Sequence, residues 1–297
     1  MKMTLCATAM LAMSGAAFAG VVVDGANFGS DYGPALWSQN VGTQFGNNTD
    51  PSLEFADGSE INALFGSVSG TTLFLGVAGN LQTNFNKLNI VLDYAAGGQN
   101  QLSSDLPNLG NLGGLTFDAG FEADAVLSFT GGNDPIEWYV DGALTDGTGG
   151  FLGGGPVAGN QLTVQLGGAD VTFSQDNSNV LGVGSFGDPF DSDPASVTTG
   201  IEIAIDLGAL GWDGVTPINI AGWVNGSGND FMSNQVIGGL PDGTGNLGGD
   251  GAGNFIGNLS GIDFNQFEGQ QFITIPTPGT VGLVGLAGFA AIRRRRA

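Results

Sequence analysis

Hydrophobic and polar positions alternate over short runs of this chain, as they do in half-buried β-strands. In Gly200–Asp206, three isoleucines occupy every second position, and Glu202, Ala204 and Asp206 lie between them. Successive side chains of a strand point to opposite faces, so this segment predicts one buried face and one solvent face that carries Glu202. Lys87–Asp93 has the same alternation, with some apolar residues on both faces.

Other short runs, rich in β-branched and aromatic residues, bring the predicted strands to about a dozen. They are Thr71–Val77, Phe121–Phe129, Ile136–Val140, Gln161–Leu166, Val171–Phe173, Val180–Val183, Ile218–Val224, Phe231–Val236 and Phe272–Ile275. The only long helical segment that the sequence predicts is a C-terminal apolar run. The fold class is therefore all-β: an antiparallel, jelly-roll-like β-sandwich with a C-terminal hydrophobic helix.

Glycine supplies 55 of the 297 residues and clusters with Asn and Asp between these runs, which is typical of turns. The stretch Gly142–Gly159 predicts a long loop within one domain that covers residues 20–275. A boundary between two smaller domains at this stretch is the alternative.

The N-terminus has the three parts of an export signal. A short basic start precedes an apolar segment, and Ala17 and Ala19 form an A-x-A site for signal peptidase. Residues 1–19 are thus a predicted signal peptide. The single cysteine, Cys6, lies within it, so the exported chain would have no disulfide.

The C-terminus, residues 276–297, combines a turn motif, an apolar run and a basic cluster. The run Val281–Ile292 would form about 18 Å of helix, which is short for a hydrocarbon core of about 30 Å. The basic cluster would stay on the cytoplasmic side of a membrane. The residues that define this segment are Pro276, Pro278, Gly279, Arg293, Arg294, Arg295 and Arg296.

This tail resembles the PEP-CTERM sorting signal of exported bacterial proteins, with Thr277 in place of the usual Glu. The resemblance implies processing by a membrane transpeptidase of the exosortase type, after the helix has held the chain transiently in the membrane. An ordinary single-span anchor is the alternative. Either interpretation predicts export, to the cell surface or the extracellular matrix.

The charge of the chain restricts its partners. Between the two terminal segments lie 28 acidic residues and one basic residue, Lys87, so the net charge there is 1 − 28 = −27. Such a surface repels nucleic acid and offers no cationic patch for anionic polysaccharides or acidic lipids. Neutral polysaccharide and divalent cations remain as candidate partners. The chain has no histidine, which excludes Ser-His-Asp and Cys-His catalysis and His-ligated zinc.

A second resemblance extends over most of the core. Asp24-Gly25, the strand pattern of Ala63–Val77, the segment Phe85–Asp93 and Gly200–Leu207 follow one another in an order similar to that of family-nine carbohydrate-binding modules and DOMON sandwiches. This resemblance implies a sandwich fold and sugar binding. The segment "FNKLNI" also resembles that of other exported proteins that carry such a tail.

Sugar binding requires exposed aromatic rings, and the candidates are Trp37, Tyr94, Trp138, Tyr139, Trp212 and Trp223. Trp138 and Trp223 lie in predicted strands, which favours core packing. Trp212 and Trp37 lie in loop-like settings and are the predicted stacking platforms.

Calcium is the candidate cofactor, because hard cations bind carboxylate and amide oxygens on Gly-containing loops. Two acidic clusters offer such ligands, and solvated turns are the alternative interpretation. The ligands are Asp188, Asp191 and Asp193 in the first cluster, and Asp242, Asn246 and Asp250 in the second.

The sequence therefore predicts an exported, non-catalytic surface or matrix protein that binds neutral polysaccharide. A structural or adhesive matrix protein without a defined ligand, stabilised by calcium, is the alternative. A glycan hydrolase is the minor one, since it needs two nearby carboxylates and the sequence pairs none with Glu202.

Overall fold

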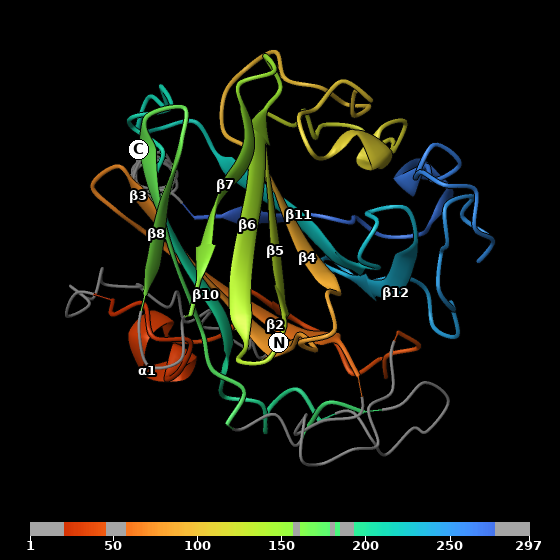
Figure 1. Ribbon diagram of the computed structural model, residues 1–297, viewed down its shortest axis with the longest axis horizontal. Helices are drawn as coiled ribbons and strands as arrows, with labels where there is room; N and C mark the ends of the chain where they lie inside the picture. The colour runs from red at the N-terminus through yellow and green to blue at the C-terminus, as the bar shows by residue number, and fades with distance from the viewer. Residues whose placement is uncertain (1–20, 46–57, 157–160, 179–181, 185–192, 277–297) are drawn as a thin grey trace, which may run out of the picture.

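The computed structural model describes residues 21–45, 58–156, 161–178, 182–184 and 193–276. These residues form two antiparallel β-sheets that pack face to face, with very little helix (Figure 1). The all-β prediction is confirmed. The predicted C-terminal helix and the predicted signal peptide lie outside the described residues, as do Ala17, Ala19, Pro278, Gly279 and the Arg293–Arg296 cluster.

The first sheet has six strands in the order β1-β2-β3-β10-β9-β8. Its strands are β1 (Trp37–Ser38), β2 (Glu60–Ser69), β3 (Thr72–Asn80), β8 (Leu162–Leu166), β9 (Ala169–Gln175) and β10 (Gly200–Asp206). A short helix, α1 (Phe28–Tyr32), lies against the outer face of this sheet.

The second sheet has seven strands: the order is β12-β11-β4-β5-β6-β7, and β13 also pairs with β11. Its strands are β4 (Lys87–Asp93), β5 (Ala125–Gly132), β6 (Glu137–Leu144), β7 (Gly149–Gly155), β11 (Ile218–Asn225), β12 (Met232–Val236) and β13 (Ile273–Ile275). Two 3₁₀ turns, η1 (Gly110–Leu112) and η2 (Phe264–Gln266), lie in the long connections.

The alternating residues of the central strands form the core between the sheets. Ile201, Ile203 and Ile205 of β10 point inward, as their spacing predicts, and meet apolar residues of β4 and β5. The rings of Phe129 and Phe173 stack across the interface, with centroids 4.9 Å apart. Burial of this apolar surface is the main term that holds two disulfide-free sheets together.

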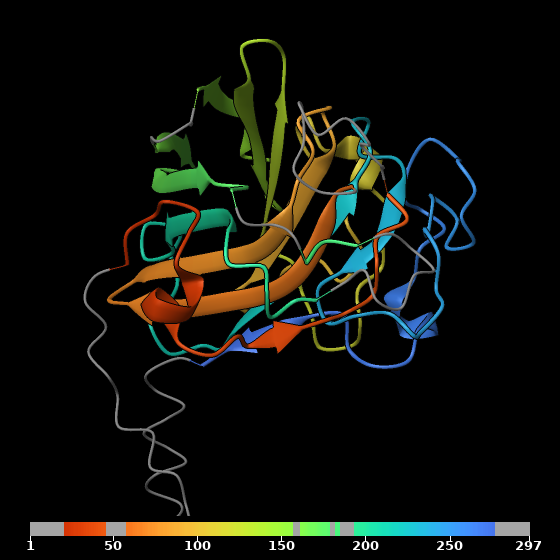
Figure 2. The same ribbon diagram turned by 90° about the horizontal axis from the view of Figure 1, so that it is seen from below.

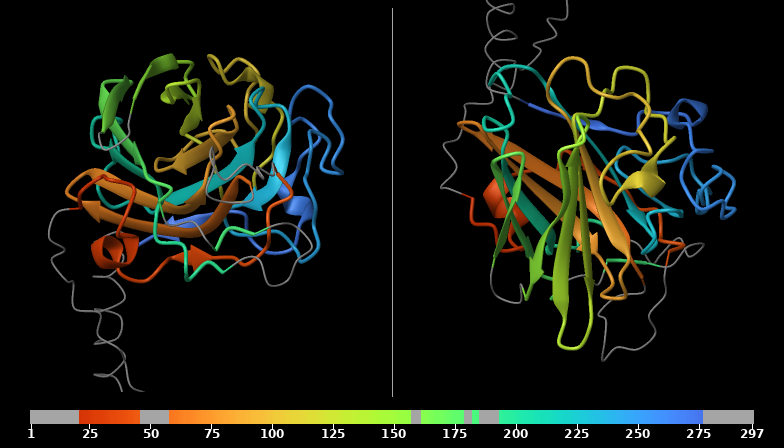
Figure 3. Two further views of the ribbon diagram at one scale, coloured as in Figure 1. Left: turned by 60° about the horizontal axis from the view of Figure 1, so that its bottom comes forward. Right: turned by 45° about the horizontal axis from the view of Figure 1, so that its top comes forward.

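A second apolar core covers part of the outer face of the seven-stranded sheet. The connections that contain η1 and η2 fold over β4, β5 and β11 at this face (Figures 2 and 3). Phe117, Phe264 and Trp223 pack against one another beneath them. The middle strands of this sheet are therefore buried on both faces.

Several sequence predictions need correction. Residues 142–156 do not form a long loop, because β6 runs to Leu144 and β7 follows it as a strand; pairing with β6 outweighs the low strand propensity of glycine. The strand predicted from Phe121 begins only at Ala125, and Phe121 packs into the second core. The predicted strand Val180–Val183 has no strand structure at Gly182 and Val183, the two of its residues that the structure describes. The predictions for Glu202 and Trp212 are corrected below.

None of the helices in the described part of the chain has the length and apolar character needed to cross a membrane. The segment on which the membrane prediction depends follows Pro276 and is not described.

The N-terminal strap, residues 21–32, crosses the six-stranded sheet at Gly25, which generates the first prediction. Gly25 has φ +80°, and a Cβ atom there would lie 2.5 Å from the backbone nitrogen of Asp176. We expect Gly25→Ala to lower the free energy of unfolding by at least about 1–2 kcal/mol, the cost of the left-handed conformation in a residue with a Cβ. Urea unfolding measures this change.

Gly29→Ala is the matched control in the same strap. Gly29 lies in α1 with open space around its Cβ position, so alanine is expected to leave stability unchanged or to raise it by about 0.5–1 kcal/mol. Equal losses in the two variants would contradict the proposed close packing of the strap.

Candidate functional site

The outer face of the seven-stranded sheet carries two adjacent rows of polar and aromatic side chains, which we call the polar strip. Registered pairing places the members of each row side by side on β11, β4, β5, β6 and β7. The first row contains Asn225, Lys87, Thr130 and Tyr139, and the second contains Trp223, Asn89, Ser128, Asp141 and Phe151.

The alternation within β4 explains why polar residues gather on this face. Leu88 and Ile90 point into the core between the sheets, so Lys87 and Asn89 point outward. The next outward residue is Val91, which belongs to the second core. The outer face thus changes from polar to apolar within one strand.

One end of the strip is open and aromatic. The rings of Tyr139 and Phe151 lie 6.5 Å apart at an interplanar angle of 44°, and Phe151 is 59% exposed. A Cβ atom on Gly154 would lie 2.6 Å from Cδ1 of Tyr139, so the ring edge occupies the space above this glycine. The Tyr139 hydroxyl donates to the Glu137 carboxylate at 2.6 Å, and this hydrogen bond raises the pKa of Tyr139.

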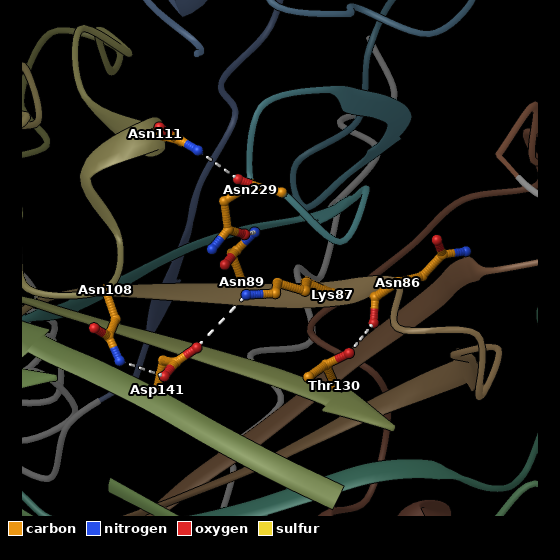
Figure 4. Close-up of polar contacts among 9 residues, drawn as sticks. Asn86, Lys87, Asn89, Asn108, Asn111, Thr130, Asp141 and Asn229 are labelled. Carbon is orange, nitrogen blue, oxygen red and sulfur yellow. Dashed lines mark hydrogen bonds and ion pairs between the residues drawn. The ribbon is translucent and has the colours of Figure 1, made fainter. Parts of the chain in front are cut away.

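The middle of the strip holds the one ion pair of the described residues. Lys87 Nζ lies 3.5 Å from the Asp141 carboxylate, and both side chains are largely buried. Asn108, from the loop before η1, donates to the other carboxylate oxygen of Asp141 at 3.2 Å, and Thr130 donates to the backbone carbonyl of Asn86 at 2.8 Å (Figure 4). Lys87 thus balances Asp141 at the centre of a strongly acidic domain.

The other end of the strip is closed. Asn89, Ser128, Trp223 and Asn225 are each at most 1% exposed. Five of their polar atoms find no hydrogen-bond partner among the described residues: Asn89 Oδ1, Ser128 Oγ, Trp223 Nε1, and Oδ1 and Nδ2 of Asn225. We call these the five open atoms. Buried polar groups are nearly always hydrogen-bonded, so five open atoms on four neighbouring residues are unusual inside a folded domain.

Of the two predicted stacking platforms, Trp212 is contradicted by its burial. Trp212 is only 5% exposed, and its indole nitrogen donates to the carbonyl of Thr216 at 2.9 Å. The apolar residues around it form the core between the sheets, so no sugar ring can stack on it in this structure. Trp37 lies in β1 and is half-buried against the same core. The core positions predicted for Trp138 and Trp223 are confirmed, at 2% and 0% exposure.

Two of the predicted calcium ligands that the structure describes, Asp250 and Asn246, form hydrogen bonds with other groups of the chain. Asp250 accepts hydrogen bonds from the backbone of Ala252 and from the backbone and amide of Asn254, and these bonds lower its pKa. The Asn246 side chain bonds to the backbones of residues 44 and 234. Asp193 and Asp242 are exposed, and Asp188 and Asp191 are not described. Within the described ranges, no group of three or more acidic residues is arranged to hold a metal ion.

Two carboxylates at the far end of the same face, Asp93 and Asp124, lie close enough for their charges to interact, and burial raises the pKa of both. Asp124 accepts from the backbone N–H groups of residues 94 and 95 at 2.7 Å, and Asp93 accepts from the Asn219 amide at 2.9 Å. These bonds stabilise the start of the connection after β4.

Glu202 does not face solvent, contrary to the sequence prediction. Its strand alternates as expected, but the N-terminal strap covers the outer face, and Glu202 is 0% exposed. Its carboxylate accepts from the backbone N–H groups of Asp24 and Gly25, at 2.8 and 3.0 Å, and from the Tyr32 hydroxyl at 2.7 Å. Glu202 therefore fastens the strap to the sheet.

Sequence reasoning missed Phe151 and the closed end of the strip. Phe151 lies in the stretch predicted as a loop. The polar positions of β4 had a usable signal, since Lys87 and Asn89 are spaced two apart within a predicted strand. Asn225 lies one residue beyond the predicted strand Ile218–Val224, although β11 includes it.

No protein-family model, no curated protein and no solved structure matches this chain.

The burial of Glu202 generates a pH prediction. Burial raises its pKa in the folded state above the ordinary value of 4.5, although hydrogen bonds from Tyr32 and the strap oppose the shift. The folded state therefore binds the proton more tightly, and the stability contributed by Glu202 is full at low pH and falls as pH rises through the folded pKa. We expect the stability of Glu202→Gln relative to the natural chain to increase between pH 5 and pH 8.

Urea unfolding at pH 5 and pH 8 measures the difference in the free energy of unfolding between Glu202→Gln and the natural chain. The contributions of the other titrating groups largely cancel in this difference. Tyr32→Phe removes a hydrogen bond that lowers the pKa of Glu202, so the natural decline with pH should become steeper in this variant. If the difference in stability between Glu202→Gln and the natural chain is the same at pH 5 and pH 8, the raised pKa of Glu202 is contradicted.

Proposed function

We propose that this chain is an exported, non-catalytic protein that binds neutral polysaccharide at the open end of the polar strip. The observation that carries the proposal is the partly exposed aromatic pair, Tyr139 and Phe151, held on a rigid sheet beside polar groups. Sugar rings present C–H groups that pack on aromatic faces and hydroxyls that require donors and acceptors. Around this pair, Glu137 and Asp141 supply acceptors, and Lys87 and Asn108 supply donors.

The charge of the domain supports a neutral ligand. With Lys87 as its single basic residue and a net charge of −27, the domain repels polyanions, whereas an uncharged chain meets no such barrier. The predicted signal peptide and the resemblance of the tail to a PEP-CTERM signal support a location at the cell surface or in the extracellular matrix, with signal peptidase and an exosortase-type enzyme as the proposed processing partners.

A structural matrix protein is the second candidate, and the burial of the tryptophans favours it. Three of the four tryptophans pack in the cores, which is the expectation for a protein whose aromatics serve only stability. The Tyr139–Phe151 pair supports binding instead, because neither ring belongs to a core cluster.

Retention of the full chain on insoluble cellulose, xylan, mannan and β-1,3-glucan, with calcium or with chelator, tests the proposed function. We expect retention on at least one of these polymers. Tyr139→Ala and Phe151→Ala should each weaken it by about tenfold, equivalent to about 1.4 kcal/mol, because each removes one stacking surface.

Phe255→Ala is the matched control, since Phe255 is 66% exposed in a loop that belongs to neither sheet. It should bind as the natural chain does. If a well-folded natural chain binds none of the four polymers in either condition, the structural matrix function replaces the binding function.

A further inference from the structure

The closed end of the polar strip has the composition of a binding site for hydroxyl groups. The five open atoms comprise two N–H donors, on Trp223 and Asn225, and two amide oxygen acceptors, on Asn89 and Asn225. The fifth, Ser128 Oγ, can donate and accept. A hydroxyl group both donates and accepts, so a polyhydroxylated ligand matches this mixture, whereas an anion or a cation would match only half of it.

The energetic cost shows that these atoms need a partner. A buried polar group without a hydrogen bond destabilises a fold, because it has lost its hydrogen bonds to water and gained none in return. Five such atoms at one place would lower the stability of a domain severely, since native proteins are only marginally stable. The arrangement is therefore stable only if ordered water or a ligand forms hydrogen bonds with these five atoms.

The turn of residues 226–230, which we call the cover, lies over Asn89 at the closed end, whereas Trp223 packs against Phe117 and Phe264. Residues 226–230 connect β11 to β12, and Asn229 within this turn accepts a hydrogen bond from the Asn89 amide at 3.3 Å. Asn111, in η1, donates to the carbonyl of Gly228 at 2.9 Å and ties the turn to the neighbouring loop (Figure 4). Asn111 is exposed, so water competes for this hydrogen bond and the bond adds little to the stability of the turn. The contact between the turn and η1 is therefore weak enough to open.

The closed end is also continuous with the open end. The first row crosses β11, β4, β5 and β6, and the second continues to Phe151 on β7 past a register shift in the β6–β7 pairing. Four strand spacings correspond to about 19 Å. Lys87 and Ser128 lie between the amides at one end and the aromatic pair at the other. A ligand on the aromatic pair can therefore extend along the strip toward the cover.

We propose that Asn89, Ser128, Trp223 and Asn225 form a covered subsite that takes the hydroxyl groups of a sugar ring when the 226–230 turn moves aside. This inference rests on the proposed function of the open end and adds a second, buried contact to it. In the absence of sugar, ordered water occupies the subsite. Sugar hydroxyls replace that water and pair the five open atoms.

Indole N–H resonances of the ¹⁵N-labelled full chain report directly on this subsite. The chain has four tryptophans, and Trp223→Phe identifies the Trp223 signal by its loss. The probes are cellohexaose, xylohexaose, mannohexaose and laminarihexaose. We expect a probe that binds to shift the Trp223 signal saturably. The Trp212 signal should stay fixed as an internal control, because its indole nitrogen is already paired with Thr216.

Two variants separate a ligand contact from structural water. Asn225→Leu keeps the side-chain shape and removes two open atoms, so it should not lower the melting temperature but should weaken probe binding by about tenfold. Asn111→Ala loosens the cover and should tighten binding several-fold, because less free energy is spent on opening. Asn80→Leu, at a buried amide of the other sheet, should leave binding unchanged.

The two proposals fail in different ways. If Tyr139→Ala abolishes probe binding while the Trp223 signal does not move and Asn225→Leu binds normally, the subsite holds water only and this inference is overturned, but the open end remains a binding site. If no probe binds to the natural chain, the proposed function fails and the subsite fails with it. A shift of Trp223 that is lost in Asn225→Leu supports both.

Discussion

The change from apolar to polar side chains along the outer face of β4 is the feature on which the rest of this structure depends. On one side of it, Val91 and its neighbours are covered by the η1 and η2 connections and form the second core. On the other side, Asn89 and Lys87 cannot be covered by apolar groups without a large desolvation cost. The apolar part of the outer face is therefore covered by the η1 and η2 connections, and the polar part is open at Tyr139 and Phe151 and closed at Asn89 and Asn225. Because the same strands are fixed from below by the core between the sheets, the polar side chains are held at defined spacings.

A domain with one basic residue must stabilise its buried carboxylates without ion pairs. Glu202 and Asp124 show how this is done: each accepts hydrogen bonds from two consecutive backbone N–H groups, and neither faces a cation. Backbone donors are fixed by the fold, so these carboxylates fasten a strap and a connection to the sheets. The single lysine is thereby left for Asp141, at the centre of the polar strip.

The sequence was sufficient for most of the strands and for much of their alternation, because period-two burial is a local property, but β1, β2 and β7 were not among the predicted strands. Gly200–Asp206 and Lys87–Asp93 were predicted with the bounds that the structure shows. What covers the outer face is a non-local property, so the burial of Glu202 under the strap and of Trp212 under its turn could not be predicted. The Tyr139–Phe151 pair depends on strand pairing for the same reason: its members lie 12 positions apart in the sequence, and only the β6–β7 register brings them together. The calcium, sorting and export predictions depend on segments that are partly or wholly outside the described residues.

The structure gives a physical reason for the high glycine content of β7, at the open end of the strip. Glycine lowers the stability of a strand interior by about 0.5–1 kcal/mol relative to alanine, so a strand such as β7, with five glycines in seven residues, is costly. A side chain at position 154 would displace the Tyr139 ring, so this ring can lie along the sheet only because residue 154 is glycine. A protein that serves only as a stable matrix scaffold would gain nothing from this loss of strand stability. A protein that must present a flat aromatic ring to a ligand gains a binding surface, so the glycine-rich edge strand β7 supports the proposed ligand binding.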